Sequence, residues 1–256
     1  MHRFTISPER ISGDRVAFDA DETRHLARVL RLGPGDVVTA TDGRGRAWEI
    51  RIVTLGDTAT GAILGAASPA AESPVAISLV QGVPKGDRME TIVRATTELG
   101  VARILPAITE RTVVRLDAAR WRDRARRWQR VAREATKQCG RAVVPAVEAP
   151  KTLAEWIASE EPADLRLCLW EVEGEPLRRV LERREDRARS ATVIVGPEGG
   201  LTRDEVARAG AAGYVPVTLG GRILRTETAG PAIVALLQYG LGDLGGAITR
   251  PGGDVP

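Results

Sequence analysis

The sequence predicts an α/β fold in which a small β-rich domain precedes a larger domain built on a parallel sheet. Three observations lead to this prediction. Residues 1–68 have the pattern of short strands separated by turns. A stretch of small residues and prolines, Ala66–Pro74, then interrupts the pattern. Beyond it, apolar strand-like runs alternate with helix-like stretches, as in a parallel sheet with helices on both faces. We therefore expect domains over residues 1–72 and 73–245 and a loose tail over residues 246–256.

The N-terminal domain is expected to form a small β-barrel. One helix, Glu22–Arg31, interrupts its strands, and the turn D-G-R-G at Asp42–Gly45 is typical of a hairpin. Small barrels often bind nucleic acid. The expected strands are Phe4–Ser7, Arg15–Asp19, Asp36–Thr41, Ala47–Leu55 and Thr60–Ala67.

The second domain is expected to contain five strands and six helices. The strands are Val75–Val83, Ile104–Thr109, Leu165–Trp170, Thr192–Val195 and Tyr214–Leu219. The helices are Arg88–Leu99, Arg120–Gln138, Leu153–Ser159, Pro176–Arg184, Arg203–Ala212 and Glu227–Tyr239. No internal repeat is evident.

Composition excludes several classes of protein. Hydrophobic residues make up 43% of the 256-residue chain, which supports a substantial core, but no apolar run is long enough to span a membrane. The N-terminus lacks the apolar segment of a signal peptide, and two isolated cysteines fit a reducing cytoplasm, so we expect a cytoplasmic protein. With only two histidines, we expect no zinc site, and this count leaves a carboxylate-bound Mg²⁺ open.

Positive charge is concentrated in one segment. The net charge is only +3, yet residues 120–141 hold nine Lys and Arg against Asp123 and Glu134. Such a patch attracts polyanions, and arginine binds phosphate in a fork geometry. A solvated helix face is the alternative. We favour contact with RNA.

Two glycine-rich turns near the C-terminus predict a ligand pocket. One is V-I-V-G-P-E-G-G-L at Val193–Leu201, and the other is L-G-G-R-I-L-R-T-E-T-A at Leu219–Ala229. Each follows a β-branched apolar run, and ligands of open parallel sheets bind at the carboxyl ends of strands. Because glycine lets the backbone approach a ligand closely, the two turns read as two walls of one pocket. A tight turn alone is the alternative for the glycines.

These strings resemble the C-terminal motifs of the knotted (SPOUT-type) RNA methyltransferases. Within that group the chain is most similar to the ribosomal small-subunit methyltransferase E family, which methylates N3 of a uridine in 16S ribosomal RNA. Further motifs follow in the order of that family: R-H-L-A-R-V-L-R-L-G-P-G-D at Arg24–Asp36, E-L-G-V at Glu98–Val101, I-T-E-R at Ile108–Arg111 and Q-C-G-R at Gln138–Arg141.

The resemblance implies a PUA-like barrel, a parallel sheet with a trefoil knot, S-adenosylmethionine as methyl donor, small-subunit ribosomal RNA as partner, and a homodimer. General topology rules argue against knots, so the knot rests on the resemblance alone. Two rivals stay open. One is a knotted methyltransferase that acts on a ribose hydroxyl or a guanine, and the other is a non-catalytic RNA-binding assembly factor.

Residues that bind the methyl donor are expected in three loops, which are the two glycine-rich turns and the loop after the strand that contains Leu169. The resemblance assigns the amino-acid or ribose side of the donor to the first turn, and the apolar residues and backbone of the second turn suit an adenine ring. Simpler explanations exist, since Thr202 and Glu205 read as a helix capping box, and Thr226 or Thr228 as a cap of the last helix. The candidates are Leu169, Gly196, Glu198, Gly199, Gly200, Leu219, Gly220, Ile223, Leu224 and Thr226.

Arg225, Glu227 and Glu198 are the candidates for the chemical step. Arg225 would stabilise a uracil anion, and Glu227 would take the N3 proton or orient Arg225. Glu198 is the alternative base. A purely structural pairing of Arg225 with Glu227 is the other possibility.

Two groups of arginines are candidates for RNA contact. On a helix over Glu22–Arg31, three arginines would share one face, with Leu26, Val29 and Leu30 opposite. On the helix Arg120–Gln138, an apolar stripe of Trp121, Ala125, Trp128, Ala132, Ala135 and Cys139 reads as core, with Gly140 as the stop. The candidates are Arg24, Arg28, Arg31, Arg122, Arg126, Arg130, Arg133 and Arg141.

Overall fold

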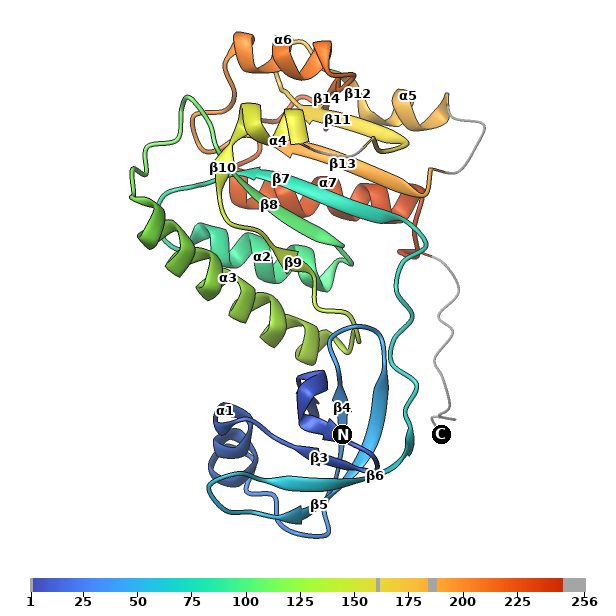
Figure 1. Ribbon diagram of the computed structural model, residues 1–256. Coiled ribbons are helices and arrows are strands. Elements are labelled where there is room, and N and C mark those ends of the chain that lie inside the picture. Colours follow the sequence, from blue (N-terminus) through green and yellow to red (C-terminus); the bar gives the residue numbers. More distant parts are fainter. Residues whose placement is uncertain (1, 160–161, 184–187, 246–256) are drawn as a thin grey trace. The chain divides into compact units, whose positions relative to one another are not determined.

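A computed structural model describes residues 2–159, 162–183 and 188–245 (Figure 1). The described chain divides into two compact units. The first holds residues 2–72 and 133–144, and the second holds residues 73–132 and the described residues from 145 onward. Helix α3 (Ala118–Cys139) contributes to both units. The expected tail, residues 246–256, lies outside the described residues.

The first unit contains a six-stranded sheet in the order β1-β4-β5-β6-β3-β2. Its pairs are antiparallel except for β1 and β4, and the expected hairpin joins β4 to β5 with Thr41 opposite Ala47. Phe4, Phe18 and Ile50 are among the fully buried side chains of its core. The strands are β1 (Arg3–Thr5), β2 (Ile11–Ser12), β3 (Arg15–Ala17), β4 (Val37–Thr41), β5 (Ala47–Thr54) and β6 (Thr60–Ala66).

The helix expected at Glu22–Arg31 differs from the prediction. An α-helix, α1 (Ala20–Arg24), passes into a π-helical turn over His25–Val29, where the Leu30 amide donates to the carbonyl of His25. Arg31 has a φ of 54°, which ends the helix. The wider π turn changes which side chains share a face. Leu26 is buried as expected, but Val29 is 68% exposed, so its placement opposite the arginines was wrong.

The second unit is built on a parallel sheet, as predicted. Its order is β10-β8-β7-β13-β11-β14-β12, and β9 also pairs with β8. Every described pair in this sheet is parallel. The strands are β7 (Ala76–Gly82), β8 (Arg103–Ile108), β9 (Ala146–Val147), β10 (Lys151–Thr152), β11 (Leu165–Leu169), β12 (Glu175–Pro176), β13 (Ser190–Val195) and β14 (Val215–Thr218).

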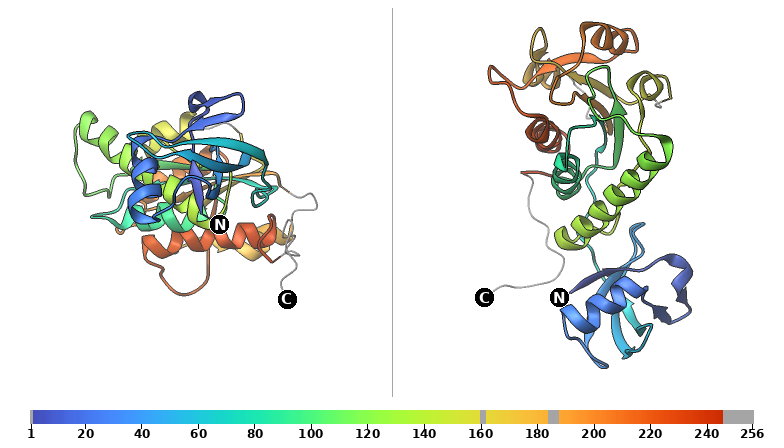
Figure 2. Two further views of the ribbon diagram at one scale, coloured as in Figure 1. Left: turned by 90° about the horizontal axis from the view of Figure 1, so that it is seen from below. Right: turned by 90° about the vertical axis from the view of Figure 1, so that its left-hand side faces the viewer.

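Helices cover both faces of this sheet (Figure 2). On one face α2 (Arg88–Glu98) packs against α7 (Thr226–Gly240), and on the other α4 (Leu153–Ser159) packs against α6 (Arg203–Ala211). A short helix, α5 (Leu177–Glu182), follows β12. The core beneath α4 and α6 contains Val80, Leu105, Trp156, Ile194 and Val206. The trefoil knot stays a prediction.

The expected apolar stripe of α3 is confirmed for its tryptophans and alanines. Trp121, Ala125, Trp128, Ala132 and Ala135 are buried, whereas Cys139 is half-buried. Gly140 follows the helix with a φ of 87°, as expected of a helix stop. Within the described residues, no helix combines the length and apolar character needed to cross a membrane.

Candidate functional site

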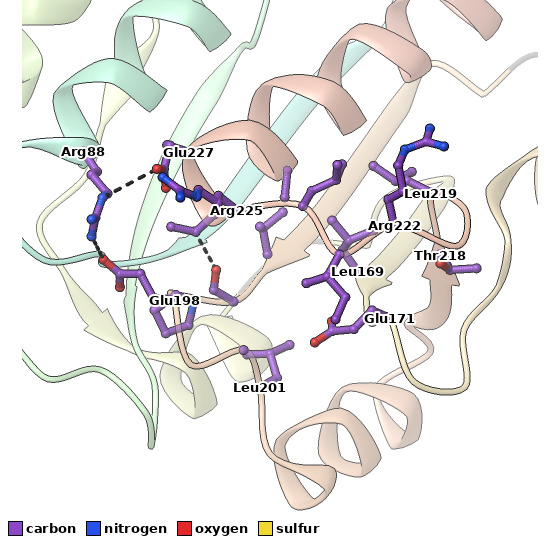
Figure 3. Close-up of a pocket in the computed structure, with 18 residues that line it drawn as sticks. Arg88, Leu169, Glu171, Glu198, Leu201, Thr218, Leu219, Arg222, Arg225 and Glu227 are labelled. Carbon is purple, nitrogen blue, oxygen red and sulfur yellow. Dashed lines mark hydrogen bonds and ion pairs between the residues drawn. The ribbon is translucent and has the colours of Figure 1, made fainter.

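The two glycine-rich turns lie on either side of one cavity in the second unit (Figure 3). Its volume is about 400 Å³, within the range of small-molecule sites. It opens where β11, β13 and β14 end, which confirms the predicted meeting of strand ends. The lining residues are Arg88, Leu169, Glu171, Val195, Gly196, Pro197, Glu198, Gly200, Leu201, Thr218, Leu219, Arg222, Ile223, Leu224, Arg225, Thr226, Glu227 and Ala229.

The first turn, residues 196–200, is built so tightly that it requires glycine. A Cβ on Gly196 would lie 2.8 Å from the carbonyl carbon of Gly200, and Gly200 itself has a φ of 69°. At the end of the adjacent strand β7, a Cβ on Gly82 would lie 2.5 Å from the nitrogen of Pro197. The turn is therefore packed against both its own chain and the neighbouring strand.

The I-T-E-R segment braces this first turn. The Arg111 guanidinium donates to the carbonyl of Gly199 at 2.7 Å, and the Glu110 amide donates to the Glu205 carboxylate at 2.8 Å. Glu205 and Thr202 also form the reciprocal capping box that the sequence predicts. Sequence reasoning missed the bracing by Arg111, because 88 positions separate it from Gly199.

Thr226 joins the two turns through its hydroxyl. The side chain is buried, donates to the carbonyl of Gly196 at 2.8 Å, and accepts from the Gln81 amide at 2.9 Å. Arg225 occupies the N-cap position of α7 without a side-chain cap bond, so neither expected threonine supplies that bond. Because the only hydroxyl proton of Thr226 is already donated to Gly196, this side chain has no hydrogen to donate to a bound methyl donor.

A charged cluster occupies one end of the cavity. Arg88 Nη1 lies 2.5 Å from Glu198 Oε1, and Arg88 Nε lies 3.6 Å from Glu227 Oε1. The Lys85 amide also donates to Glu198, at 2.9 Å. Burial raises the pKa of the Glu198 carboxyl, but its own amide, the Lys85 amide and the Arg88 guanidinium together hold that pKa below its usual value.

Arg88 is one of the lining residues that the sequence prediction missed. It begins α2 just after β7, and β7 lies beside β13 in the sheet. The rule that pointed to the two turns, that strand ends meet at one edge, applies equally to the loop after β7. Glu171, Leu201 and Thr218 were missed as well.

The second turn, residues 219–225, is open to solvent. Ile223 is 82% exposed, Arg222 and Arg225 are exposed, and Leu219 and Leu224 are half-buried. Gly220 has a φ of 118°, and a Cβ there would meet no atom within 4 Å. Ten of the predicted donor and catalytic residues line the cavity, whereas Gly199 and Gly220 are not among its lining residues.

The arginines expected to contact RNA fall into two kinds. Arg24 pairs with Asp21 at 3.1 Å and Arg126 pairs with Asp123, so part of the like-charge repulsion is relieved within the protein. Within the part of the chain that the structure describes, no hydrogen bond or ion pair engages the side chains of Arg28, Arg31, Arg122, Arg130 and Arg133.

Arg141 does not fit an RNA-contact role. It is only 7% exposed, and its guanidinium donates to Glu72 Oε2 from Nε at 3.0 Å and from Nη2 at 2.7 Å, and to Glu72 Oε1 from Nε at 3.3 Å. A buried ion pair with Glu72 holds the segment after Gly140, and burial keeps most of this guanidinium away from a phosphate in solution. We exclude Arg141 from the RNA surface considered below.

Comparisons with known proteins agree with this geometry. A family of RNA methyltransferase domains matches residues 71–238, and a family of RNA methyltransferase PUA domains matches residues 18–59. The chain is 34% identical over 240 residues to ribosomal RNA small subunit methyltransferase E of Synechocystis, covering 93% of this chain and 76% of that protein. It is 30% identical to the Bacillus subtilis protein of the same name, covering 86% and 88%.

A solved structure is similar over most of the chain. The crystal structure of a ribosomal RNA small subunit methyltransferase E from Neisseria gonorrhoeae, bound to S-adenosyl methionine, superimposes with a TM-score of 0.86 at 36% identity. The match covers 95% of this chain and 99% of that chain.

Among the described residues, no group of three or more His, Cys, Asp or Glu is placed to hold a metal ion.

Proposed function

The chain belongs to the ribosomal RNA small subunit methyltransferase E family, and we propose that it methylates N3 of a uridine in 16S ribosomal RNA. Its methyl donor is S-adenosylmethionine. The observation that carries the proposal is that two glycine-rich turns form opposite walls of one cavity. The cluster of Arg88, Glu198 and Glu227 lies at one end, and Leu169 and Leu219 lie toward the other end, beside Glu171 and Arg222 (Figure 3).

The lining residues fit the donor. Leu169, Leu219 and Leu224 offer apolar walls for an adenine ring, and backbone groups of Gly196 and Gly200 lie on the opposite wall. When bound, S-adenosylmethionine supplies the methyl group, since the carbon–sulfur bond breaks as the carbon–nitrogen bond forms and sulfur keeps the electron pair. The protein's task is to hold uracil N3 in line with that bond.

The chain must also remove the N3 proton of uracil, because that nitrogen's lone pair is unavailable while it is protonated. Glu227 takes this proton on a carboxylate oxygen, and Arg225 stabilises the negative charge that spreads onto the uracil carbonyl oxygens. Glu227→Gln keeps the shape but accepts no proton. We expect it to be slow at neutral pH and to recover as pH rises toward the ionisation of uracil itself, which single-turnover rates would reveal.

The arginines of the barrel and of α3 are proposed to contact RNA phosphates. They are Arg24, Arg28, Arg31, Arg122, Arg126, Arg130 and Arg133. Each lost phosphate contact should reduce the salt slope of RNA binding by about 0.7–0.9. Triple alanine replacement at Arg24, Arg28 and Arg31 should flatten that slope without changing donor affinity. An unchanged slope would mean that these arginines are only solvated.

We further propose a cytoplasmic homodimer. α7 exposes Leu236 and Tyr239, the latter by 73%, although it is packed against α2 on its other side. Exposed large apolar side chains on one helix favour an interface. Sedimentation should report a dimer, and Tyr239→Asp should shift it toward monomer.

Methyl transfer from labelled donor into purified small subunits, large subunits and transfer RNA tests the proposed activity. We expect label in small-subunit RNA only, and mass spectrometry of digested RNA should place it on N3 of one uridine. Label on a ribose or a guanine would favour another knotted methyltransferase. Donor-independent RNA binding without transfer would favour an assembly factor.

A further inference from the structure

We propose that Arg88 is a positioning residue that holds Glu198 as a fixed anion and leaves Glu227 free to take the substrate proton. This inference rests on the proposed function and adds a residue to it. It assigns unequal roles to two carboxylates that lie on either side of one guanidinium (Figure 3).

Arg88 links three elements that are distant in sequence. Arg88 begins α2, which follows strand β7. Glu198 lies in the glycine-rich turn after β13, and Glu227 lies at the N-terminal end of helix α7. Contacts of 2.5 Å to Glu198 and 3.6 Å to Glu227 therefore link residues 196–200 to helix α7, which carries the proposed base. A single guanidinium offers donors on several edges, which suits a bridge between two carboxylates.

The two carboxylates are held unequally. Glu198 receives the shorter contact from Arg88 and also the Lys85 amide at 2.9 Å. Glu227 receives only the longer contact from Arg88 among the ion pairs that the structure describes. Glu227 is therefore the less firmly held of the two carboxylates. It is the carboxylate that accepts the substrate proton.

Other charged groups nearby do not take over Arg88's role. Asp87, which precedes α2, and Glu90 on α2 pair with Arg127, at 3.7 and 2.6 Å. Lys85 contacts Glu198 through its backbone amide. Arg225 precedes Glu227 and lines the same cavity, where we have assigned it to the uracil anion, and Glu171 and Arg222 lie toward the opposite end (Figure 3).

The Arg88→Gln variant separates positioning from a merely structural role. Removing the cation takes a positive charge from beside both carboxylates, which favours their protonated form. The acid limb of the single-turnover rate profile should then move to higher pH. At neutral pH the rate should fall by about 10²-fold. Donor affinity, measured by calorimetry, should change less than the rate does, because the first glycine-rich turn keeps its contacts with Arg111 and Thr226.

A readout that needs no activity tests the same contact. In the free protein, carbon-13 NMR should show that the pKa of the Glu198 carboxyl rises toward its ordinary value when Arg88 becomes Gln, since one of the groups that lower it is gone. This result does not depend on which RNA is the substrate. Failure of wild-type methyl transfer would therefore count against the proposed function, and an unmoved Glu198 would count against the role of Arg88.

Two further variants serve as controls. Arg94→Gln removes an exposed charge from the same helix and should leave both the rate profile and Glu198 unchanged. Arg88→Lys keeps the charge and should restore the position of the acid limb, with only part of the rate. The proposal is overturned if Arg88→Gln lowers the rate equally at every pH, or if it acts no differently from Arg94→Gln.

Discussion

The two turns that line the cavity are held in different ways. Residues 196–200 are fixed from several sides: Arg111 binds the carbonyl of Gly199, Thr226 binds the carbonyl of Gly196, and Arg88 binds Glu198. Residues 219–225 have few such links among the described contacts. Where this turn leaves β14, two local hydrogen bonds join Thr218 and Gly220, at 3.2 and 3.3 Å.

This difference indicates a division of labour between the two walls. A segment with many buried or bonded groups is stable in place, whereas one with exposed side chains opens at low free-energy cost. Residues 196–200 therefore form the more firmly held wall of the cavity, and residues 219–225 form the more exposed one. Substitutions in the first turn should therefore damage fold and binding together, and those in the second should act mainly on ligand and chemistry.

The largest expected effect is that of Gly196→Val. Its Cβ would lie 2.8 Å from the carbonyl carbon of Gly200, and backbone atoms cannot step aside as a flexible side chain would. Overpacking of this kind costs about 1–3 kcal/mol. We expect lower thermal stability and no measurable donor binding. Gly221→Val is the matched control, since a Cβ there meets nothing within 4 Å, and equal damage in both variants would contradict the comparison.

Arg225→Ala should act on the rate and spare the fold. Loss of one preorganised hydrogen-bond donor at a developing charge slows a reaction by about 10²–10³-fold. Donor affinity and thermal stability should change little, because the side chain is exposed. Single-turnover transfer measured beside calorimetry would check this. A large loss of stability would show that the second turn is also structural.

Gly220→Val should weaken donor binding while the protein stays folded. The backbone there has a φ of 118°, which a branched residue adopts only at a cost of about 1–3 kcal/mol. The strain is local because the neighbouring space is open. We expect calorimetric affinity to fall by about tenfold or more, with an unchanged circular dichroism spectrum. Unchanged affinity would move the pocket away from this turn.

Arg111→Ala and Arg222→Ala compare one arginine from each wall. Arg111 donates to the Gly199 carbonyl, and a hydrogen bond of this kind contributes about 0.5–1.5 kcal/mol to the free energy of unfolding. Arg222 is exposed, and its removal should not change that free energy. Urea unfolding of both variants would decide. The account fails on this point if Arg222→Ala is the more destabilised.

The smallest expected effect is a change in how the stability of Glu198→Gln depends on acid pH. The pKa of the Glu198 carboxyl lies below its ordinary value of 4.5, so its contribution to stability is present above that value and is lost as pH falls through the lowered pKa. Glu198→Gln should therefore lose less stability than the wild type between about pH 5 and pH 3. Thermal unfolding over that range would measure the difference. Parallel curves would show that Glu198 does not stabilise the first turn.

Much of the fold could be predicted because parallel strands are buried on both faces and appear as continuous apolar runs. The two-residue strands β9, β10 and β12 are too short to leave any such pattern. The π turn at His25–Val29 was missed because apolar spacing does not distinguish an extra residue in a helical turn from an ordinary one.

The site was predictable where glycine marks the backbone and unpredictable where side chains meet across the sheet. The turns at 196–200 and 219–225 stand out by composition. The Arg88–Glu198 contact joins residues 110 positions apart, and neither residue has a local feature that points to the other. Knowing that β7 and β13 are neighbours supplies the missing information.

Amide hydrogen exchange of the full chain, with and without saturating S-adenosylmethionine, tests the central claim most directly. In the free protein, we expect the amides of residues 219–225 to exchange much faster than those of residues 196–200. Donor should slow exchange in both turns, with the larger change in residues 219–225. Equal exchange of the two turns in the free protein, or donor protection confined to another part of the chain, would contradict the account.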